Sequence, residues 1–286
     1  MSDLLLRHRA HTPSVEPPAE PAVLVPPRAA HAVRRAGRLA LAAGLRSVAV
    51  VAFLVLWEVA PRTGLVDRVF LPPLSEVLAT TRDLAASGQL GEHVRASLGR
   101  AGSGFGIAVV TAIPLGLLIG WYRTVSAVLS PILEAFRNTA ALALLPVFVL
   151  VLGIGETSKI ALVAFASFFP ILLNTIAGVR TVDPLLVKSA RSLGLSPLRL
   201  FQKVILPSAV PTIFTGLRMA GAASVLVLVA AEMIGAQAGL GYLINAAQLN
   251  FQIPEMYAGI LTISVIGIVV NYALLAAERR FSRWRA

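Results

Sequence analysis

Few residues of this sequence lie in arrangements that could perform covalent chemistry. The segment GIGETSK at residues 153–159 places glycines, a serine and a lysine close together, as phosphate-binding loops do. Such a loop needs a glycine, four residues, and then Gly-Lys-Ser/Thr, whereas here Ser158 precedes Lys159. The order excludes a phosphate loop, so we expect a tight turn between helices and no ATP site in this chain.

The sequence also contains no arrangement of residues that is typical of a catalytic triad, a pair of catalytic carboxylates or a metal site. The 286 residues contain no cysteine and only four histidines. His8, His11 and His31 lie near the N-terminus, and His93 stands alone in a polar stretch. Because no nucleophile, base and orienting group can be assembled, we expect no catalytic residue, no metal and no cofactor in this chain.

The remaining candidates are polar residues in or beside apolar runs. Glu58, Glu134 and Glu232 each stand at the end of such a run, and each is either an ion-pair or gate residue inside a helix bundle or a carboxylate solvated at the interface. Solvation is the commoner case. Asn138 and Asn174 either form hydrogen bonds between helices, the commoner role, or line a pore. Four of these residues are our candidates for a translocation path or gate: Glu134, Asn138, Asn174 and Glu232.

The composition is that of a membrane protein. The chain is 57% hydrophobic and 14% charged, with a mean hydropathy of +0.80, whereas soluble domains are about 25% charged. The formal net charge of +11 indicates cytoplasmic loops and contact with membrane lipid. Because no basic stripe is interleaved with aromatic residues, nucleic acid is excluded as a partner.

The chain divides into two regions. Residues 1–33 contain six prolines between Pro13 and Pro27, which predicts a disordered cytoplasmic tail. Residues 34–286 predict an all-α transmembrane domain with six spans, of which the first is the weakest because Arg46 and Glu58 crowd it. The predicted spans are residues 39–60, 101–122, 131–155, 160–179, 211–231 and 256–277.

The distribution of lysine and arginine orients these spans. Most of the basic residues lie at 34–46, 123–137, 180–218 and 279–285, whereas residues 233–255 contain none. Because positive loops stay on the cytoplasmic side, both termini and residues 180–218 are predicted to be cytoplasmic.

The segment from Val187 to Pro207 is the most unusual stretch, because it is basic and lies between two apolar runs. Asp183 and Pro184 predict a helix start, and Gly194 predicts its end. Ser196 and Pro197 then predict a second short helix. Such a segment either docks a cytosolic partner or lies on the inner leaflet, and its composition leaves the two about even.

The spacing in this segment resembles the cytoplasmic loop of binding-protein-dependent ABC importer permeases. That motif reads Glu-Ala-Ala, three residues, Gly, nine residues, Ile, one residue and Leu-Pro. Ala190, Gly194, Leu206 and Pro207 fall at the expected positions, and Val204 takes the place of Ile, whereas Lys188 and Ser189 replace Glu and Ala. By this resemblance, the ATPase-coupling residues are Lys188, Ser189, Ala190, Gly194, Leu206 and Pro207 within a coupling loop at 183–207.

The resemblance extends over residues 45–280 and is similar to the nitrate/sulfonate/taurine branch of these permeases. It rests on short motifs such as Leu144-Leu-Pro146, Phe168-Phe-Pro170 and Ala231-Glu-Met233. At Asn138-Thr139-Ala140 the branch usually has a proline-containing turn, so a straighter helix is expected here.

The resemblance implies a type I ABC importer permease-like fold in the cytoplasmic (inner) membrane. It implies as partners an ATP-binding subunit that binds the ATP, a periplasmic or lipid-anchored solute-binding protein, and a second permease copy in a homodimer. The solute would be a small anion, with aliphatic sulfonate or taurine ahead of nitrate or bicarbonate. Two alternatives stay open: an ion-gradient-driven secondary transporter, and a membrane anchor for a cytosolic protein without transport.

Overall fold

The computed structural model describes residues 48–281, and this part of the chain is helical with no β-strand. A boundary between Val55 and Leu56 divides it into two units. Residues 48–62 are helical, but the predicted tail at 1–33 and the start of the first predicted span lie outside the described residues.

The remaining helices all belong to the second unit. Their bounds are α2 (Leu74–Ala86), α3 (Gln89–Trp121), α4 (Arg123–Arg137), η1 (Ala141–Leu144), α5 (Leu145–Leu152), α6 (Glu156–Arg180), α7 (Pro184–Ser192), α8 (Pro197–Leu200), η2 (Phe201–Ile205), α9 (Leu206–Glu232), α10 (Leu240–Leu249) and α11 (Ile253–Phe281).

Four helical stretches of the described chain are long and apolar enough to cross a membrane. They are α3, α6, the stretch Pro197–Glu232 and α11. A fifth candidate is the pair Thr124–Arg137 and Ala141–Leu152, if the two bent halves count as one span. Four of the six predicted spans therefore correspond to long helical stretches of the described chain, and the predicted span 131–155 corresponds to this bent pair.

The bend between these two halves corrects the expectation of a straighter helix at residues 138–140. The halves meet at 84°. The Asn138 amide donates to the Glu134 carbonyl at 2.8 Å, and the Thr139 hydroxyl donates to the Ala135 carbonyl at 3.1 Å. These side chains bind carbonyls of the last turn of α4, and Ala140 is extended, so the helix ends without a proline.

Helices α3, α6 and α9 pack closely because small residues lie where they meet. A Cβ atom on Gly104 or Gly116 of α3 would lie 2.7 Å from side-chain atoms of Val163 or Thr175 on α6. A Cβ atom on Gly216 of α9 would lie 2.7 Å from the Cβ atom of Asn174. Small residues at helix interfaces let backbones approach in this way.

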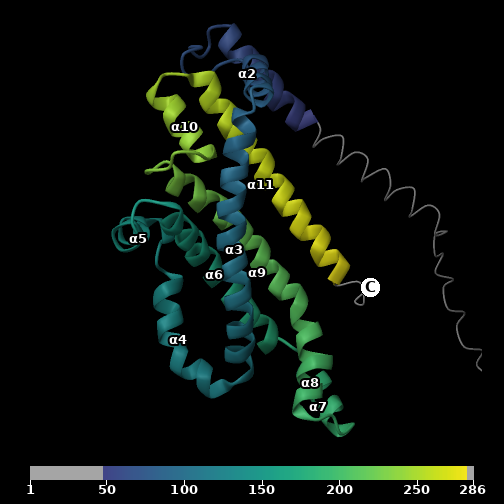
Figure 1. The fold of residues 1–286 in the computed structure, drawn as a ribbon. Helices are drawn as coiled ribbons and strands as arrows, with labels where there is room; N and C mark the ends of the chain where they lie inside the picture. The colour runs from purple at the N-terminus through teal and green to yellow at the C-terminus, as the bar shows by residue number, and fades with distance from the viewer. Residues whose placement is uncertain (1–47, 282–286) are drawn as a thin grey trace, which may run out of the picture. The chain divides into compact units, whose positions relative to one another are not determined.

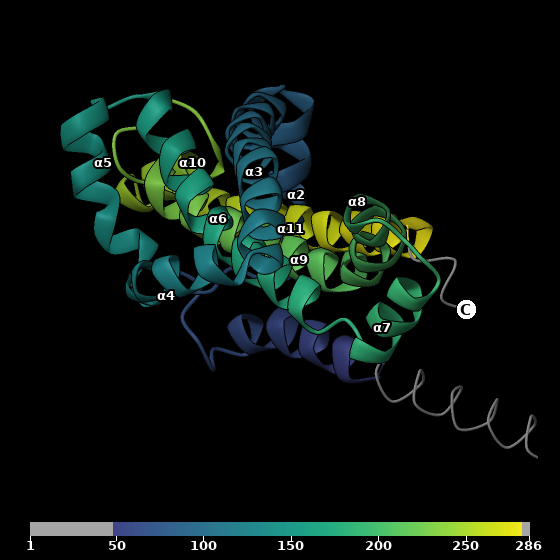
Figure 2. The same ribbon diagram turned by 90° about the horizontal axis from the view of Figure 1, so that it is seen from below.

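The second unit has two distinct ends. Helices α2 and α10 lie near one end of α3 and α9, and α7 and α8 lie at the other end of α9 (Figure 1). Helices α4 and α5 lie on the opposite side of α6 from α7 and α8 (Figure 2). The polar candidates are therefore distributed over different parts of this unit.

Helix α2 begins directly after Pro73, which occupies the N-cap position and provides no side-chain cap. The Glu58 carboxylate instead accepts hydrogen bonds from the Ser75 amide and hydroxyl, both at 2.9 Å, and Arg62 holds that carboxylate at 2.5 Å. A carboxylate at this helix start is favoured by the helix dipole.

Candidate functional site

The segment between α6 and α9 forms two short helices with a closed turn between them. The Asp183 carboxylate accepts a hydrogen bond of 2.8 Å from the Leu185 amide and caps α7. At the other end, the Gly194 amide donates to the Arg191 carbonyl at 2.9 Å, and the Leu195 amide donates to the Ala190 carbonyl at 3.2 Å. This pair of bonds is a Schellman motif, and the φ of +76° at Gly194 provides the left-handed residue it requires.

The second short helix continues directly into α9. Helix α8 starts at Pro197, passes through the π-helical turn Phe201–Ile205, and joins α9 at Leu206, so Pro197–Glu232 is one helical stretch of 36 residues. Pro207 and Pro211 lack the amide hydrogen of an ordinary helical turn, and a wider π turn next to them is a local adjustment to such prolines. Helix α8, the π turn and α9 are therefore continuous in the structure.

The predicted coupling residues face two directions. Ala190 is buried in the cluster that also holds Leu200 and Ile205, so it faces the chain's own core. Lys188, Ser189 and Gly194 are exposed, and Leu206 and Pro207 are half-buried within the continuous helix.

Four leucines of the segment between α6 and α9 are exposed. We call Leu185, Leu186, Leu193 and Leu198 the leucine patch. Leu193 is 80% exposed, so its side chain does not pack into the core of this chain. Exposed apolar patches of this kind mark interaction sites with proteins or membranes.

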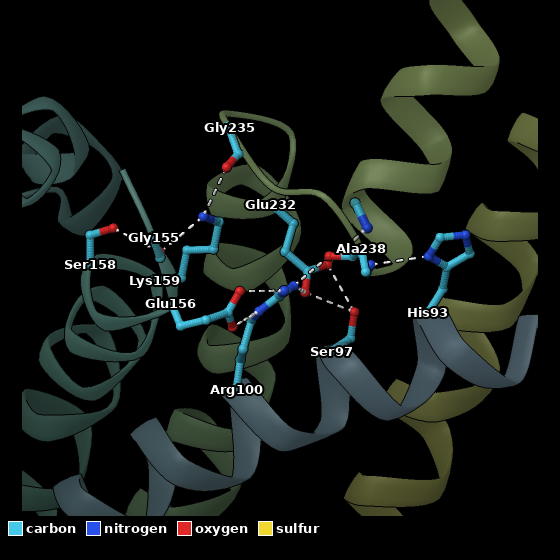
Figure 3. A network of polar contacts seen from close by, with 12 residues as sticks. His93, Ser97, Arg100, Gly155, Glu156, Ser158, Lys159, Glu232, Gly235 and Ala238 are labelled. Atoms are coloured by element: carbon cyan, nitrogen blue, oxygen red, sulfur yellow. Dashed lines mark hydrogen bonds and ion pairs between the residues drawn. The ribbon is translucent and has the colours of Figure 1, made fainter. Parts of the chain in front are cut away.

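A second site is a network of polar contacts at the C-terminal end of α9 (Figure 3). Arg100 of α3 and Glu232 of α9 form an ion pair with Nη1 and Oε1 2.6 Å apart, and the Glu232 side chain is fully buried. The Ser97 hydroxyl donates to the same carboxylate at 2.8 Å, and the Gly241 amide donates to it at 2.9 Å. Glu232 is therefore not solvated at an interface.

The other edge of Arg100 binds α6. Its Nη2 donates to Glu156 Oε1 at 2.7 Å and its Nε donates to the other oxygen of Glu156, while Nη1 also donates to the Ala238 carbonyl at 2.6 Å. Lys159 is buried and donates to the carbonyls of Gly155 at 3.0 Å and Gly235 at 3.3 Å. The network thus joins α3, α6 and α9 to the segment between α9 and α10.

This network holds a chain segment in place and has no free group for chemistry. Two cations face two carboxylates, and His93 accepts the Gly239 amide hydrogen at 3.2 Å while Ser97 accepts that of Leu240 at 2.8 Å. Because buried charges need partners and hydrogen bonds, the network fixes residues 233–241 against α3.

The sequence pattern did not identify Arg100. Its partner Glu232 lies 132 positions away, and a pair so far apart in the sequence cannot be recognised from local spacing. A usable signal was the spacing of His93, Ser97 and Arg100, because residues four and then three positions apart lie on one face of a helix.

The four path candidates do not form one site. Glu134 is exposed and lies 3.3 Å from Arg137, and Asn138 is exposed at the end of α4. Asn174 of α6 donates to its own helix at the Pro170 carbonyl, 2.8 Å away, and lies 3.8 Å from Met219 Sδ. Among residues 48–281, no group of three or more His, Cys, Asp or Glu side chains could hold a metal ion.

Aromatic side chains gather beside Glu134 and Asn138. Phe136 of α4 stacks on Phe169 of α6 with ring centroids 5.6 Å apart, and Phe165 contacts both rings and Phe148 of α5. This cluster holds both halves of the bent pair against α6.

Comparison with known proteins gives a consistent match. The family model "Binding-protein-dependent transport system inner membrane component" matches residues 112–285. The taurine transport system permease protein of Escherichia coli K12 is 37% identical over 236 residues, which cover 81% of this chain and 86% of that protein. A putative aliphatic sulfonates transport permease protein of Bacillus subtilis is 34% identical over 270 residues, covering 93% and 97%.

Solved structures share the fold. The MetNI methionine ABC transporter, in an inward-facing conformation, matches with a TM-score of 0.54 at 20% identity, over 65% of this chain and 93% of that one. The all-α, type I importer permease fold expected from the sequence is confirmed. This chain belongs to the family of binding-protein-dependent transport system inner membrane components, and it is a multi-pass membrane protein.

Proposed function

We propose that this chain is the permease subunit of an ABC importer for small organic sulfonates, with taurine and aliphatic sulfonates ahead of nitrate and bicarbonate. One structural observation carries the mechanism: the exposed turn at Gly194 is joined to α9 by one unbroken helical stretch, Pro197–Glu232. The substrate class is supported by the relatives that are named for taurine and aliphatic sulfonates.

The distribution of charge supports an orientation in the inner membrane. The end with α7 and α8 carries Arg180, Lys188, Arg191, Arg199 and Lys203, whereas residues 233–255 contain no lysine or arginine. Basic segments stay in the cytoplasm, so α7 and α8 face the cytoplasm and the Arg100 network lies near the outer face. Both termini are then cytoplasmic.

The energy comes from a partner that binds and hydrolyses ATP. The leucine patch and Lys188 are the surface that this ATP-binding subunit contacts, and Ala190 supports the patch from the inside. When two ATP-binding subunits close, they tilt α8 and α9 as one body. The Arg100–Glu232 pair joins the far end of α9 to α3, so both helices tilt together.

A second copy of the chain completes the path. Helices α4 and α5 expose a broad apolar face that includes Val128, Leu150 and Val151, as an interface between copies would. Glu134 and Asn138 on α4 and Asn174 on α6 are the path candidates, and Glu232 acts as part of the outer gate. A periplasmic or lipid-anchored solute-binding protein delivers the solute to the outer end.

Transport assays with purified components test this proposal. The chain is reconstituted in liposomes with its ATP-binding subunit and its solute-binding protein, and uptake of labelled taurine is measured with and without ATP inside. We expect uptake only with ATP and solute-binding protein together. Leu193→Glu places a charge in the leucine patch and should abolish uptake, while Leu150→Glu should disturb pairing of the two copies.

The same assay separates the alternatives. Uptake that needs no ATP and stops when an ion gradient is collapsed would identify a secondary transporter instead. Binding of the ATP-binding subunit without uptake of any sulfonate, nitrate or bicarbonate would identify a membrane anchor.

A further inference from the structure

A groove of about 740 Å³ lies between α9 and α11. It continues into a smaller cavity of about 150 Å³ between α3, α9 and α11. The two spaces share the lining residues Gly221, Val225, Ile263, Val270 and Leu274, so they form one trough, the α9–α11 groove.

Glycines leave this groove unfilled. A Cβ atom on Gly221 would lie 2.9 Å from Leu274 Cδ1, so this glycine lets α9 and α11 approach each other. A Cβ atom on Gly267 in the groove, or on Gly102 in the smaller cavity, would meet no described atom within 4 Å. The walls are otherwise mostly apolar, so the groove has the shape and polarity that suit a hydrocarbon chain.

One end of the groove is polar. Arg218 lines it with a side chain that is 31% exposed, and Nη1 lies 3.3 Å from Glu278 Oε2. Within residues 48–281 this ion pair is the only polar interaction of the Arg218 guanidinium, although the group has five hydrogen-bond donors. Arg218 itself lines the groove, so a donor that Glu278 does not occupy is available to an anion bound there.

The charge at this end is positive. Arg279 and Arg280 follow Glu278 on α11 and are exposed, so three arginines stand against one glutamate. Asn271 and Tyr272 line the same groove and are exposed, and tyrosine is enriched at membrane interfaces.

We propose that the α9–α11 groove binds one anionic phospholipid. The phosphate lies on Arg218, next to Asn271 and Tyr272, and an acyl chain extends past Val225 and Ile263 toward the cavity beside Gly102. This placement puts the lipid in the inner leaflet, which rests on the proposed orientation. The site itself does not depend on what the chain transports.

A phospholipid fits better than an apolar helix as the occupant. A helix lying over the groove would bury the Arg218 donors without acceptors, and unsatisfied buried donors are costly. A phosphate supplies charged acceptors, and bonds between arginine and phosphate are among the stronger hydrogen bonds. Anionic headgroups also gain from each basic residue near the surface.

Lipid binding to the purified full-length chain tests the proposal. Native mass spectrometry measures the affinity for phosphatidylglycerol and for phosphatidylcholine with the same acyl chains. We expect one phosphatidylglycerol per chain at an affinity about fivefold above that for phosphatidylcholine. Arg218→Gln should remove this preference, whereas Arg137→Gln, which removes an arginine with an equal 3.3 Å ion pair elsewhere, should keep it.

A second variant tests the acyl-chain part. Gly267→Leu adds a side chain to the groove at a position where a Cβ atom would meet no described atom within 4 Å, so it should fold and weaken binding of both lipids. Gly106→Leu, equally unobstructed but not among the groove's lining residues, is the matched control. Equal affinity for both lipids, or an Arg218→Gln variant that keeps the preference, would overturn the proposal.

Cysteine cross-linking tests the other occupants, because the natural chain has no cysteine. A disulfide between Val51→Cys and Ile268→Cys would show that the N-terminal helix covers the groove. A disulfide between Ile268→Cys of two copies would show that a second copy does. Either disulfide would overturn the proposal of a lipid site. If a lipid occupies the groove, we expect that neither disulfide forms.

Discussion

Arg100 on α3 and Glu232 on α9 lie 2.6 Å apart in an ion pair that joins two long helices at one end. Glu232 is fully buried, and the Arg100 side chain is 6% exposed. The pair is further bonded to Ser97, Glu156 and the Ala238 carbonyl. It therefore combines the two features that make a buried ion pair costly to break, which are burial and a complete set of hydrogen bonds.

Removal of one partner of this pair should destabilise the protein strongly. Arg100→Met leaves the Glu232 carboxylate buried without its cation, so we expect a loss of about 3–5 kcal/mol. The thermal unfolding midpoint of the purified chain in detergent measures this loss. Arg137→Met breaks the exposed pair with Glu134 and should change stability by less than about 1 kcal/mol.

The double variant Arg100→Met, Glu232→Leu sharpens the test. It replaces both charges, so it should recover part of the stability lost in Arg100→Met, because no uncompensated charge stays buried. A single variant that is as stable as the natural chain would contradict the role assigned to this pair.

Two glycines of α3 should respond in opposite directions to alanine. In Gly116→Ala the new methyl group would lie 2.7 Å from Thr175 Cβ and 3.0 Å from the Leu172 carbonyl oxygen, so we expect a loss of about 1–3 kcal/mol. In Gly106→Ala it would meet nothing within 4 Å, and removal of a helix glycine should stabilise by about 0.5–1 kcal/mol. Unfolding midpoints that shift in the same direction would contradict this packing.

Local signals were enough to predict part of this structure from the sequence. Asp183, Pro184 and Gly194 fix both ends of α7 through contacts within a few residues, so its start and end could be predicted. Four apolar runs of residues 101–277 were recognised as spans by length and lack of charge, and they correspond to α3, α6, α9 and α11.

Features that depend on distant or competing contacts could not be predicted in this way. The Arg100–Glu232 pair joins residues 132 positions apart, and the spacing of His93, Ser97 and Arg100 on one face of α3 indicates a polar face without identifying the distant partner. The bend after α4 has no proline at residues 138–140, because Asn138 and Thr139 end the helix through hydrogen bonds to its carbonyls. Ala190 faces inward because α8 and the π turn fold back over α7, a placement that the motif does not contain.

Deletion of residues 1–33 should leave transport unchanged. Six prolines lie between Pro13 and Pro27, and this composition predicts a region that does not contribute to the packed domain. ATP-dependent uptake per molecule in the membrane is the measurement, with membrane level determined in parallel. A drop in uptake at equal membrane level would assign a function to this region.

Gly194 should tolerate asparagine but not valine. Its φ of +76° lies in the left-handed region, which asparagine adopts at modest cost and a β-branched residue does not. A Cβ atom there would meet nothing within 4 Å, so the Cβ atom of neither variant should clash within the chain. With the ATP-binding subunit and the solute-binding protein present, Gly194→Asn should keep solute-stimulated ATP hydrolysis, and Gly194→Val should lose most of it while the chain still inserts. The expected loss arises because valine opens the Schellman motif that fixes α7 against α8. Equal stimulation of ATP hydrolysis in both variants would show that the shape of this turn does not matter for coupling.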